Sequence, residues 1–382
     1  MTGLLLFSSC KKQDIEPGNL QQPADDCVNG RSANDGAIVE GKYIISYNSS
    51  VVNARTMSPQ RIAELGTRTL ANNSIQSSSL ELSFGGEPGG FVAKLTKDEA
   101  TRLKTDPSIS IVEPDRIVAL GTCFTVAEPR LLTWGVNRVG YGNGIGKTAW
   151  IIDSGIDFDH PDLTVDVTRS KSFITGNLSA DDENGHGTHV AGIIGAKNNS
   201  IGILGVASGA TLVSLRVLGA DGEGFLSYIV QALAYVNTNA KAGDVVNMSL
   251  GEDVASASLD LQVQNTAAKG ILIAVAAGND SKPAHDFSPG RTNAANIFTV
   301  SAIDSLDNFA SFSNYGNDVV DVAAPGVHIL STYTNGRYAI MSGTSMATPH
   351  VAGLLLLKGK NISSSGTAKN DPDGTPDPIA HY

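Results

Sequence analysis

The chain has 382 residues and a net charge of −11, because 38 acidic side chains outnumber 27 basic ones. This length allows two or three domains of about 100–200 residues each. The basic residues do not form the clusters typical of a nucleic-acid surface, so we expect no nucleic-acid partner. The 41 glycines favour a compact protein with many tight turns over a coiled coil or a charged repeat.

Residues 1–10 have the pattern of a short export signal. An apolar run, Leu4–Phe7, is followed by two serines and Cys10. The run is too short to span a bilayer, which takes about 20 residues, and it lacks the basic start of a secretory signal. The order of apolar run, small residues and cysteine nevertheless resembles a bacterial lipoprotein signal. We predict export with lipid attachment at Cys10, and the alternative is a disordered N-terminus.

Residues 11–36 are polar and contain prolines, so they predict a flexible linker. Residues 37–120 then have the pattern of a small α+β domain. Strands are predicted at Tyr43–Tyr47, Gly90–Thr96 and Ile109–Asp115, and helices at Pro59–Ala71 and Lys97–Thr105.

Residues 121–358 contain three motifs that suit nucleophilic catalysis. Thr148–Asp153 is an apolar run that ends in a carboxylate, which predicts a buried parallel strand. His186 and Ser345 each stand where a glycine-containing turn opens a helix of small residues. The free N–H groups at a helix start can stabilise a developing oxyanion, which is what a nucleophilic serine requires.

Each motif also has an ordinary structural interpretation. A serine at a helix start is often only an N-cap, an aspartate after a strand is often a turn residue, and a single histidine is often structural. The occurrence of all three, in the order Asp, His, Ser, favours a catalytic triad. His189 follows His186 at His-x-x-His spacing, but the glutamate of a zinc motif is missing, so we predict a structural role for it and for His350.

The three motifs, together with five shorter ones, resemble the subtilisin family of serine proteases, with some local features closer to its proteinase K branch. The shorter motifs are Asn198–Gly202, Val246–Gly251, Ala276–Asn279, Ser311–Gly316 and Ala324–Gly326. The resemblance implies an α/β fold, namely a subtilisin-like three-layer domain with a mostly parallel sheet and helices on both faces. It also implies that residues 37–120 are a small α+β, ferredoxin-like prodomain that inhibits the enzyme.

The family's catalytic roles fall on four residues of this chain. The resemblance implies that Ser345 is the nucleophile, that His186 is its general base, and that Asp153 orients the imidazole. The side-chain amide of Asn279 and the backbone N–H of Ser345 would form the oxyanion hole.

The resemblance also implies where a peptide substrate binds, as an added strand between two edges. The implied substrate-binding residues are Gly222, Glu223, Gly224, Ser249, Leu250, Gly251, Ala276, Ala277 and Gly278. None of the implied pocket-wall positions is charged, so we predict a preference for an apolar or aromatic side chain. Asp280, near the rim, would tolerate a basic one.

A structural calcium site is the cofactor that the resemblance implies. Its ligands would be the side chains of Asp162 and Asn199 and the carbonyl groups of Lys197, Ile201 and Ile203. Oxygen ligands suit this hard cation. The alternative is an ordinary turn rich in asparagine.

The prodomain implies that the enzyme is a self-processing zymogen, and we expect the protein to be a monomer. Its last segment, Arg116–Leu120, would lie in the cleft, and we predict cleavage after Leu120. Cys27 and Cys123 flank the prodomain and either pair in an oxidising envelope or remain free thiols.

Residues 359–382 are rich in turn-forming residues and predict a polar tail with little to bury. Two other functions remain open at this point. One is a non-catalytic binding protein on the same fold, although every triad residue and Asn279 are present. The other is a narrow processing protease for one partner.

Overall fold

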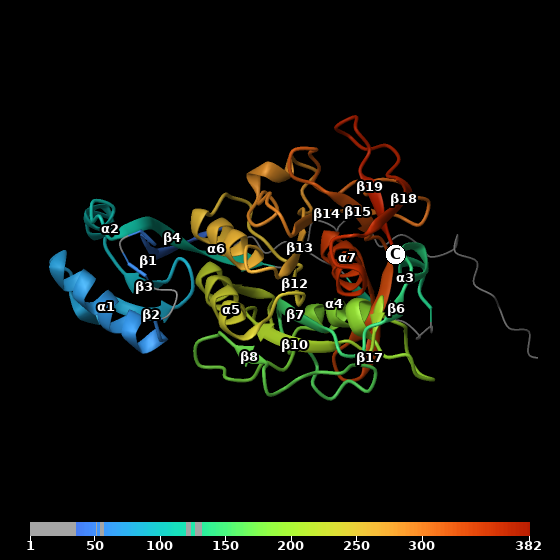
Figure 1. The fold of residues 1–382 in the computed structure, drawn as a ribbon, viewed down its shortest axis with the longest axis horizontal. Helices are drawn as coiled ribbons and strands as arrows, with labels where there is room; N and C mark the ends of the chain where they lie inside the picture. The colour runs from blue at the N-terminus through green and yellow to red at the C-terminus, as the bar shows by residue number, and fades with distance from the viewer. Residues whose placement is uncertain (1–35, 51, 54–56, 120–123, 127–131) are drawn as a thin grey trace, which may run out of the picture.

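The computed structural model of the chain describes residues 36–50, 52–53, 57–119, 124–126 and 132–382. The predicted signal, nearly all of the linker, Leu120 and the three cysteines (Cys10, Cys27 and Cys123) lie outside these residues. The described residues form a small α+β unit beside a larger α/β unit (Figure 1).

The small unit is an antiparallel sheet with two helices, as the sequence predicts. In chain order its elements are β1 (Ile38–Tyr47), α1 (Pro59–Asn72), the 3-10 helix η4 (Ser77–Ser79), β2 (Leu80–Phe84), β3 (Gly90–Lys94), α2 (Lys97–Leu103) and β4 (Ile109–Ala119). Ser58 caps α1, and Thr96 forms a capping box with Glu99 at the start of α2. These side chains satisfy N–H groups that a helix start leaves free. Ile62 and Phe91, both fully buried, lie in the hydrophobic core of the small unit.

Strand β4 continues from the small unit onto the large one. Its end pairs in antiparallel fashion with β11 (Glu223–Phe225), which belongs to the large unit, so that Ala119 lies opposite Glu223. The sheet order is therefore β11-β4-β1-β3-β2. Main-chain pairing across the boundary joins the two units along one continuous sheet.

Two carboxylates of β4 also cap helices of the large unit. Asp115 accepts hydrogen bonds from the backbone N–H of Ser227, at 3.0 Å, and from its hydroxyl, at 2.7 Å, at the start of α5 (Leu226–Asn239). Glu113 accepts from the backbone N–H of Ser258, at 3.0 Å, at the start of α6 (Ala257–Ala267). A negative charge is favoured at a helix N-terminus, so both contacts stabilise the docked small unit.

The large unit is built around a sheet whose strand order is β18-β19-β15-β14-β13-β12-β7-β10-β8. The strands are β7 (Thr148–Asp153), β8 (Lys171–Ser172), β10 (Thr211–Arg216), β12 (Val245–Met248), β13 (Leu272–Ala276), β14 (Ile297–Ile303), β15 (Val322–Pro325), β18 (Ser363–Thr367) and β19 (Pro378–His381). Neighbouring strands are parallel except for β18 and β19. The mostly parallel sheet confirms the prediction.

Helices cover both faces of this sheet, which gives three layers (Figure 1). Ala149 and Ile151 of β7 point into the core that holds α3 (Trp134–Val139), α4 (His186–Gly195) and α7 (Thr344–Lys358). Trp150 and Ile152 of the same strand point into the opposite core, with α5 and α6. A strand buried on both faces explains why Thr148–Asp153 reads as a continuous apolar run.

The remaining described elements are short. They are β5 (Phe124–Val126), β6 (Gly142–Asn143), β9 (Ala207–Ser208), η5 (Ala284–Asp286), β16 (Ile329–Tyr333) and β17 (Arg337–Met341). β5 pairs with β17, and only residues 120–123 separate it from β4 in the sequence. Within the described ranges, no helix is both long and apolar enough to cross a bilayer.

The C-terminal segment differs from the polar tail that we expected. Its β19 extends the main sheet beside β15, with Ile379 opposite Ala323, and Ile379 and Ala380 are fully buried. The backbone N–H of Tyr382 donates to the carbonyl of Val139 at 2.8 Å. These few apolar residues give only a weak strand pattern in a segment rich in turn-forming residues. A single strand can nevertheless join a sheet largely through main-chain hydrogen bonds.

This segment makes stability depend on pH through Asp377. Burial, together with the nearby carboxylates of Asp371 and Asp373, raises the pKa of Asp377 to about 7, although the hydrogen bond from Ser301 acts in the opposite direction. A pKa raised above its unfolded value means that the folded state binds this proton more tightly. The contribution of protonated Asp377 to the stability of the fold is therefore fully present below the unfolded pKa, and it is lost as pH rises through about 7.

We expect Asp377→Asn to raise Tm by several degrees at alkaline pH and to leave it nearly unchanged in acid. The asparagine oxygen can still accept from Ser301, so only the charge is removed. Thermal unfolding of both proteins across the pH range measures the effect, with Asp318→Asn, at an exposed carboxylate, as the control. An equal Tm for Asp377→Asn and wild type in alkali would contradict it.

Candidate active site

Asp153 and His186 form a hydrogen-bonded pair at one end of the main sheet. Asp153 is the last residue of β7, and the carboxyl ends of parallel strands are where polar sites gather. Its Oδ1 lies 2.8 Å from Nδ1 of His186, and the two side chains are 0% and 1% exposed. With Nδ1 donating to the carboxylate, Nε2 of the imidazole is left as a proton acceptor.

The turn before α4 fixes the position of His186. The buried carboxylate of Asp182 accepts from the hydroxyl of Ser154 and from the backbone N–H of Gly185, each at 3.0 Å. Gly185 has a φ of +111°, and an added Cβ would lie 2.0 Å from the ring of Tyr333. Only glycine fits there, which explains the glycine that the sequence places before the histidine.

Ser345 lies in the first turn of α7, which packs against α4. Its hydroxyl donates to the carbonyl of Ser249 at 3.0 Å, and the hydroxyl of Ser249 donates back to the carbonyl of Ser345 at 2.8 Å. Nε2 of His186 is buried and makes no hydrogen bond to the residues described. The structure therefore contains the Asp153–His186 bond but not a bond between Ser345 and His186.

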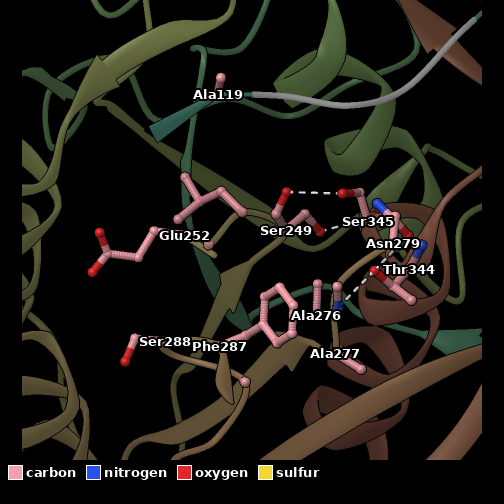
Figure 2. A pocket seen from close by; sticks show the side chains of 14 residues that line it. Ala119, Ser249, Glu252, Ala276, Ala277, Asn279, Phe287, Ser288, Thr344 and Ser345 are labelled. Atoms are coloured by element: carbon pink, nitrogen blue, oxygen red, sulfur yellow. Dashed lines mark hydrogen bonds between the residues drawn. The ribbon is translucent and has the colours of Figure 1, made fainter. Parts of the chain in front are cut away.

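Asn279 is held in place through its side-chain oxygen. Its Oδ1 accepts from the backbone N–H of Thr344, at 2.8 Å, and from the Thr344 hydroxyl, at 2.9 Å. Because both donors use the oxygen, Nδ2 remains free to donate elsewhere. Asn279, Thr344 and Ser345 line the same pocket (Figure 2).

That pocket collects most of the predicted substrate-binding residues. It is lined by Ala119, Ser249, Leu250, Gly251, Glu252, Ala276, Ala277, Gly278, Asn279, Phe287, Ser288, Gly290, Thr344 and Ser345. The other predicted edge, residues 222–224, does not line this pocket. Gly222 directly precedes β11, and Glu223 and Gly224 lie within β11 and pair with β4. Ala119 reaches the pocket from β4, which places the end of the small unit at the candidate active site (Figure 2).

The sequence motifs do not predict several residues that line the pocket, including Glu252 and Phe287. Glu252 adds a charged residue to a pocket lining that we expected to be uncharged, and Phe287 adds an aromatic ring to the same lining. Glu252 directly follows the predicted edge Ser249–Gly251, so extending that segment by one residue would have found it. No motif near Phe287 in the sequence indicates a role in the pocket. The residue directly precedes Ser288, which also lines the pocket.

The predicted calcium ligands Asp162 and Asn199 are neighbours in the structure. Asp162 accepts from Nδ2 of Asn199 and from the N–H of Ile203, each at 2.9 Å, and from the hydroxyl of Tyr338 at 3.2 Å. Burial raises the pKa of Asp162, so its charge is costly there without a cation. The described residues contain no group of three or more His, Cys, Asp or Glu side chains arranged for a metal ion, so a cation here would depend on carbonyl and amide oxygens.

His189 and His350 have the structural roles that we predicted. Nε2 of His189 lies 3.0 Å from the carbonyl of Ile329 and 3.1 Å from that of Ala339. Nδ1 of His350 lies 2.8 Å from the carbonyl of Met346. Burial lowers the pKa of His189 to about 3 and that of His350 to about 4, so both stay neutral.

Comparison with known proteins extends over both units. The sequence pattern of the subtilase family matches residues 146–367, which is more than half of the chain, and that of the peptidase inhibitor I9 family matches residues 42–121. M-protease from Shouchella clausii is 42% identical over 280 residues, which cover 71% of this chain and 70% of that protein.

Two further proteins are similar to this chain, one over nearly its whole length and one with a solved structure. The extracellular serine proteinase of a Thermus species is 34% identical over 94% of this chain and 88% of its own. A crystal structure of a cold-adapted subtilisin-like serine proteinase matches with a TM-score of 0.58 and 34% identity, covering 66% of this chain and 98% of that one.

Proposed function

Because the chain belongs to the subtilase family and is a subtilisin-type serine protease with an inhibitor-type prodomain, we propose that Ser345, His186 and Asp153 are its catalytic triad. The observation that carries this assignment is the buried 2.8 Å bond between Asp153 and His186. A carboxylate in that position fixes the tautomer in which Nε2 can act as a base and stabilises the imidazolium that forms.

Catalysis would begin with a rotation of the Ser345 hydroxyl. In the structure this hydroxyl donates to the carbonyl of Ser249, so it must turn toward Nε2 of His186 before its proton can be taken. The oxygen then attacks the substrate carbonyl, and His186 passes the proton to the leaving amine, which yields an acyl-enzyme. A water molecule that is activated by the same histidine hydrolyses the ester.

The oxyanion would be held by Nδ2 of Asn279 and by the backbone N–H of Ser345. The support for Asn279 is its orientation, since Thr344 occupies its oxygen and leaves its amide nitrogen to donate. The support for Ser345 is its place in the first turn of α7, where N–H groups lack helical partners.

Hydrolysis of casein and of short peptides by the processed protein tests this function. A fluorophosphonate label should attach to Ser345 and abolish the activity. A protein that binds peptides but neither hydrolyses them nor takes up the label would instead be the non-catalytic alternative.

We also propose that β4 acts as the inhibitory segment. It lies along β11, the edge that a substrate strand would occupy, and Ala119 enters the pocket. The bond that we predict to be cut, after Leu120, lies outside the described residues, and N-terminal sequencing of the mature protein would identify it. Much of the pocket is apolar, which favours broad specificity over a single processing target.

Calcium at the loop of residues 197–203 is part of the proposal. Asp162 and Asn199, with the carbonyls of Lys197, Ile201 and Ile203, offer only oxygen ligands around a buried carboxylate. Since Nδ2 of Asn199 faces Asp162, its amide must turn over to bind a cation. A bound calcium ion would stabilise the fold without entering the reaction.

We expect EDTA to lower Tm by several degrees, because an ion that binds only the folded state stabilises it by about 2.7 kcal/mol at a hundred times Kd. Differential scanning calorimetry with EDTA, followed by excess calcium or magnesium, measures the effect. Calcium should restore Tm, and Asp162→Asn should remove the response. An unchanged Tm in EDTA would rule out the site.

We further propose that the protein is exported. The support is the pattern of residues 1–10 and the name of the Thermus relative, which is an extracellular proteinase. Lipid attachment at Cys10 and pairing of Cys27 with Cys123 stay predictions, and metabolic labelling with a fatty acid and thiol titration would test them.

A further inference from the structure

Glu252 is a buried acidic residue on the wall of the substrate pocket. It is 1% exposed and lines the pocket beside Leu250, Phe287 and Ser288. Its backbone N–H donates to the carbonyl of Ser288 at 2.9 Å, which fixes the residue on the wall. In Figure 2 its carboxylate lies on the side of the pocket away from Asn279. A positive charge near a carboxylate that is removed from water to this extent lowers the cost of its burial.

A cation of the small unit approaches this carboxylate. Nε of Arg116 lies 4.0 Å from Oε2 of Glu252, and the arginine side chain is 22% exposed. Arg116 belongs to β4 and directly precedes the three residues that pair with β11. β4 thus lies on the substrate-binding edge as an extended peptide and presents a basic side chain to the wall.

Removal of the small unit takes Arg116 away from Glu252. A substrate that adds to β11 in the register of β4 brings its own side chain to the same place. We propose that Glu252 forms an acidic subsite that selects peptides with arginine or lysine. The basic residue of such a peptide occupies the position of Arg116, three residues before the residue in the position of Ala119. The inference rests on the proposed protease function and names a substrate class for that cleft.

Two peptides that copy residues 112–127 of the chain, with a fluorophore and a quencher at their ends and serine in place of Cys123, test the proposal. They differ only at position 116, which is arginine in one and glutamine in the other. We expect the mature enzyme to cleave the arginine peptide with a kcat/KM that is about tenfold higher or more, as for a partly desolvated charge pair. This comparison uses the wild-type enzyme, so it does not depend on the folding of a variant.

Glu252→Gln then assigns the preference to this residue. The variant keeps the shape of the side chain and should cleave the two peptides at rates within about threefold of each other. The control Asp318→Asn removes one exposed negative charge elsewhere and should keep the preference for arginine. A lysine peptide should behave more like the arginine peptide than the glutamine one, because charge rather than shape is recognised.

The outcomes separate this inference from the function on which it rests. Equal cleavage of the two peptides by the wild type, or an unchanged preference in Glu252→Gln, overturns the subsite. Hydrolysis of casein without cleavage of either peptide overturns it as well, because the register argument then fails. Absence of all hydrolysis, with no labelling by a fluorophosphonate, overturns the proposed function and the subsite together.

Discussion

Replacing Ser345 with alanine is expected to leave the chain whole and inactive. The hydroxyl is the only atom group lost, and without it no acyl-enzyme can form. In subtilisin itself, loss of the nucleophile lowers kcat by about 10⁶-fold, and we expect a decrease of similar size. Because the same serine would cut the prodomain, intact-mass spectrometry should show that wild type loses about 120 residues while Ser345→Ala loses none.

The control for this experiment is Ser363→Ala, which removes a hydroxyl from the exposed strand β18 and should be processed normally. Processing of Ser345→Ala at the wild-type rate would mean that another protease cuts the chain or that Ser345 is not the nucleophile. Labelling of wild type by a fluorophosphonate, with no labelling of Ser345→Ala, distinguishes these two explanations.

Asn279→Asp is expected to lower kcat by about 10²–10³-fold or more, with a much smaller change in KM. The substitution keeps the oxygen that accepts from Thr344, so the loop should remain in place. It replaces the donating Nδ2 by an oxygen, which repels the developing oxyanion instead of binding it. Steady-state kinetics on a soluble peptide, together with circular dichroism to check the fold, measures both effects.

The matched control is Asn293→Asp, which makes the same chemical change on the surface, where Nδ2 of Asn293 donates to the carbonyl of Asp318. It should leave kcat within about twofold of wild type. A kcat for Asn279→Asp within tenfold of wild type would remove Asn279 from the oxyanion hole.

Much of the fold follows from local sequence patterns. Helix α1 was expected at Pro59–Ala71 and is found at Pro59–Asn72, because the proline, the N-cap serine and the apolar spacing agree. Strand β7 ends at Asp153, as its apolar run indicates. The pair Asp153 and His186 could be predicted because glycine at position 185 and the adjacent strand end are both strong local signals.

Other features depend on contacts between distant segments. The charge on the pocket wall comes from Glu252, whose environment is set by the loop at Ser288 and by Arg116 of the small unit. The bond from the Ser345 hydroxyl to Ser249 joins residues that are 96 positions apart. No pattern within one segment encodes such contacts, so the sequence indicated the residues of the triad but neither the charge on the pocket wall nor the direction of each hydrogen bond.

The attachment of β4 to both units also makes inhibition depend on concentration. In the uncut chain, β4 is tethered to the cleft through residues 120–123, and a short tether gives an effective concentration in the millimolar range. After the cut, the same contacts, including the caps from Glu113 and Asp115, hold a separate molecule that dilution can remove. Blockade of the cleft is thus independent of protein concentration before the cut, whereas afterwards a concentrated sample stays blocked and a dilute one becomes active.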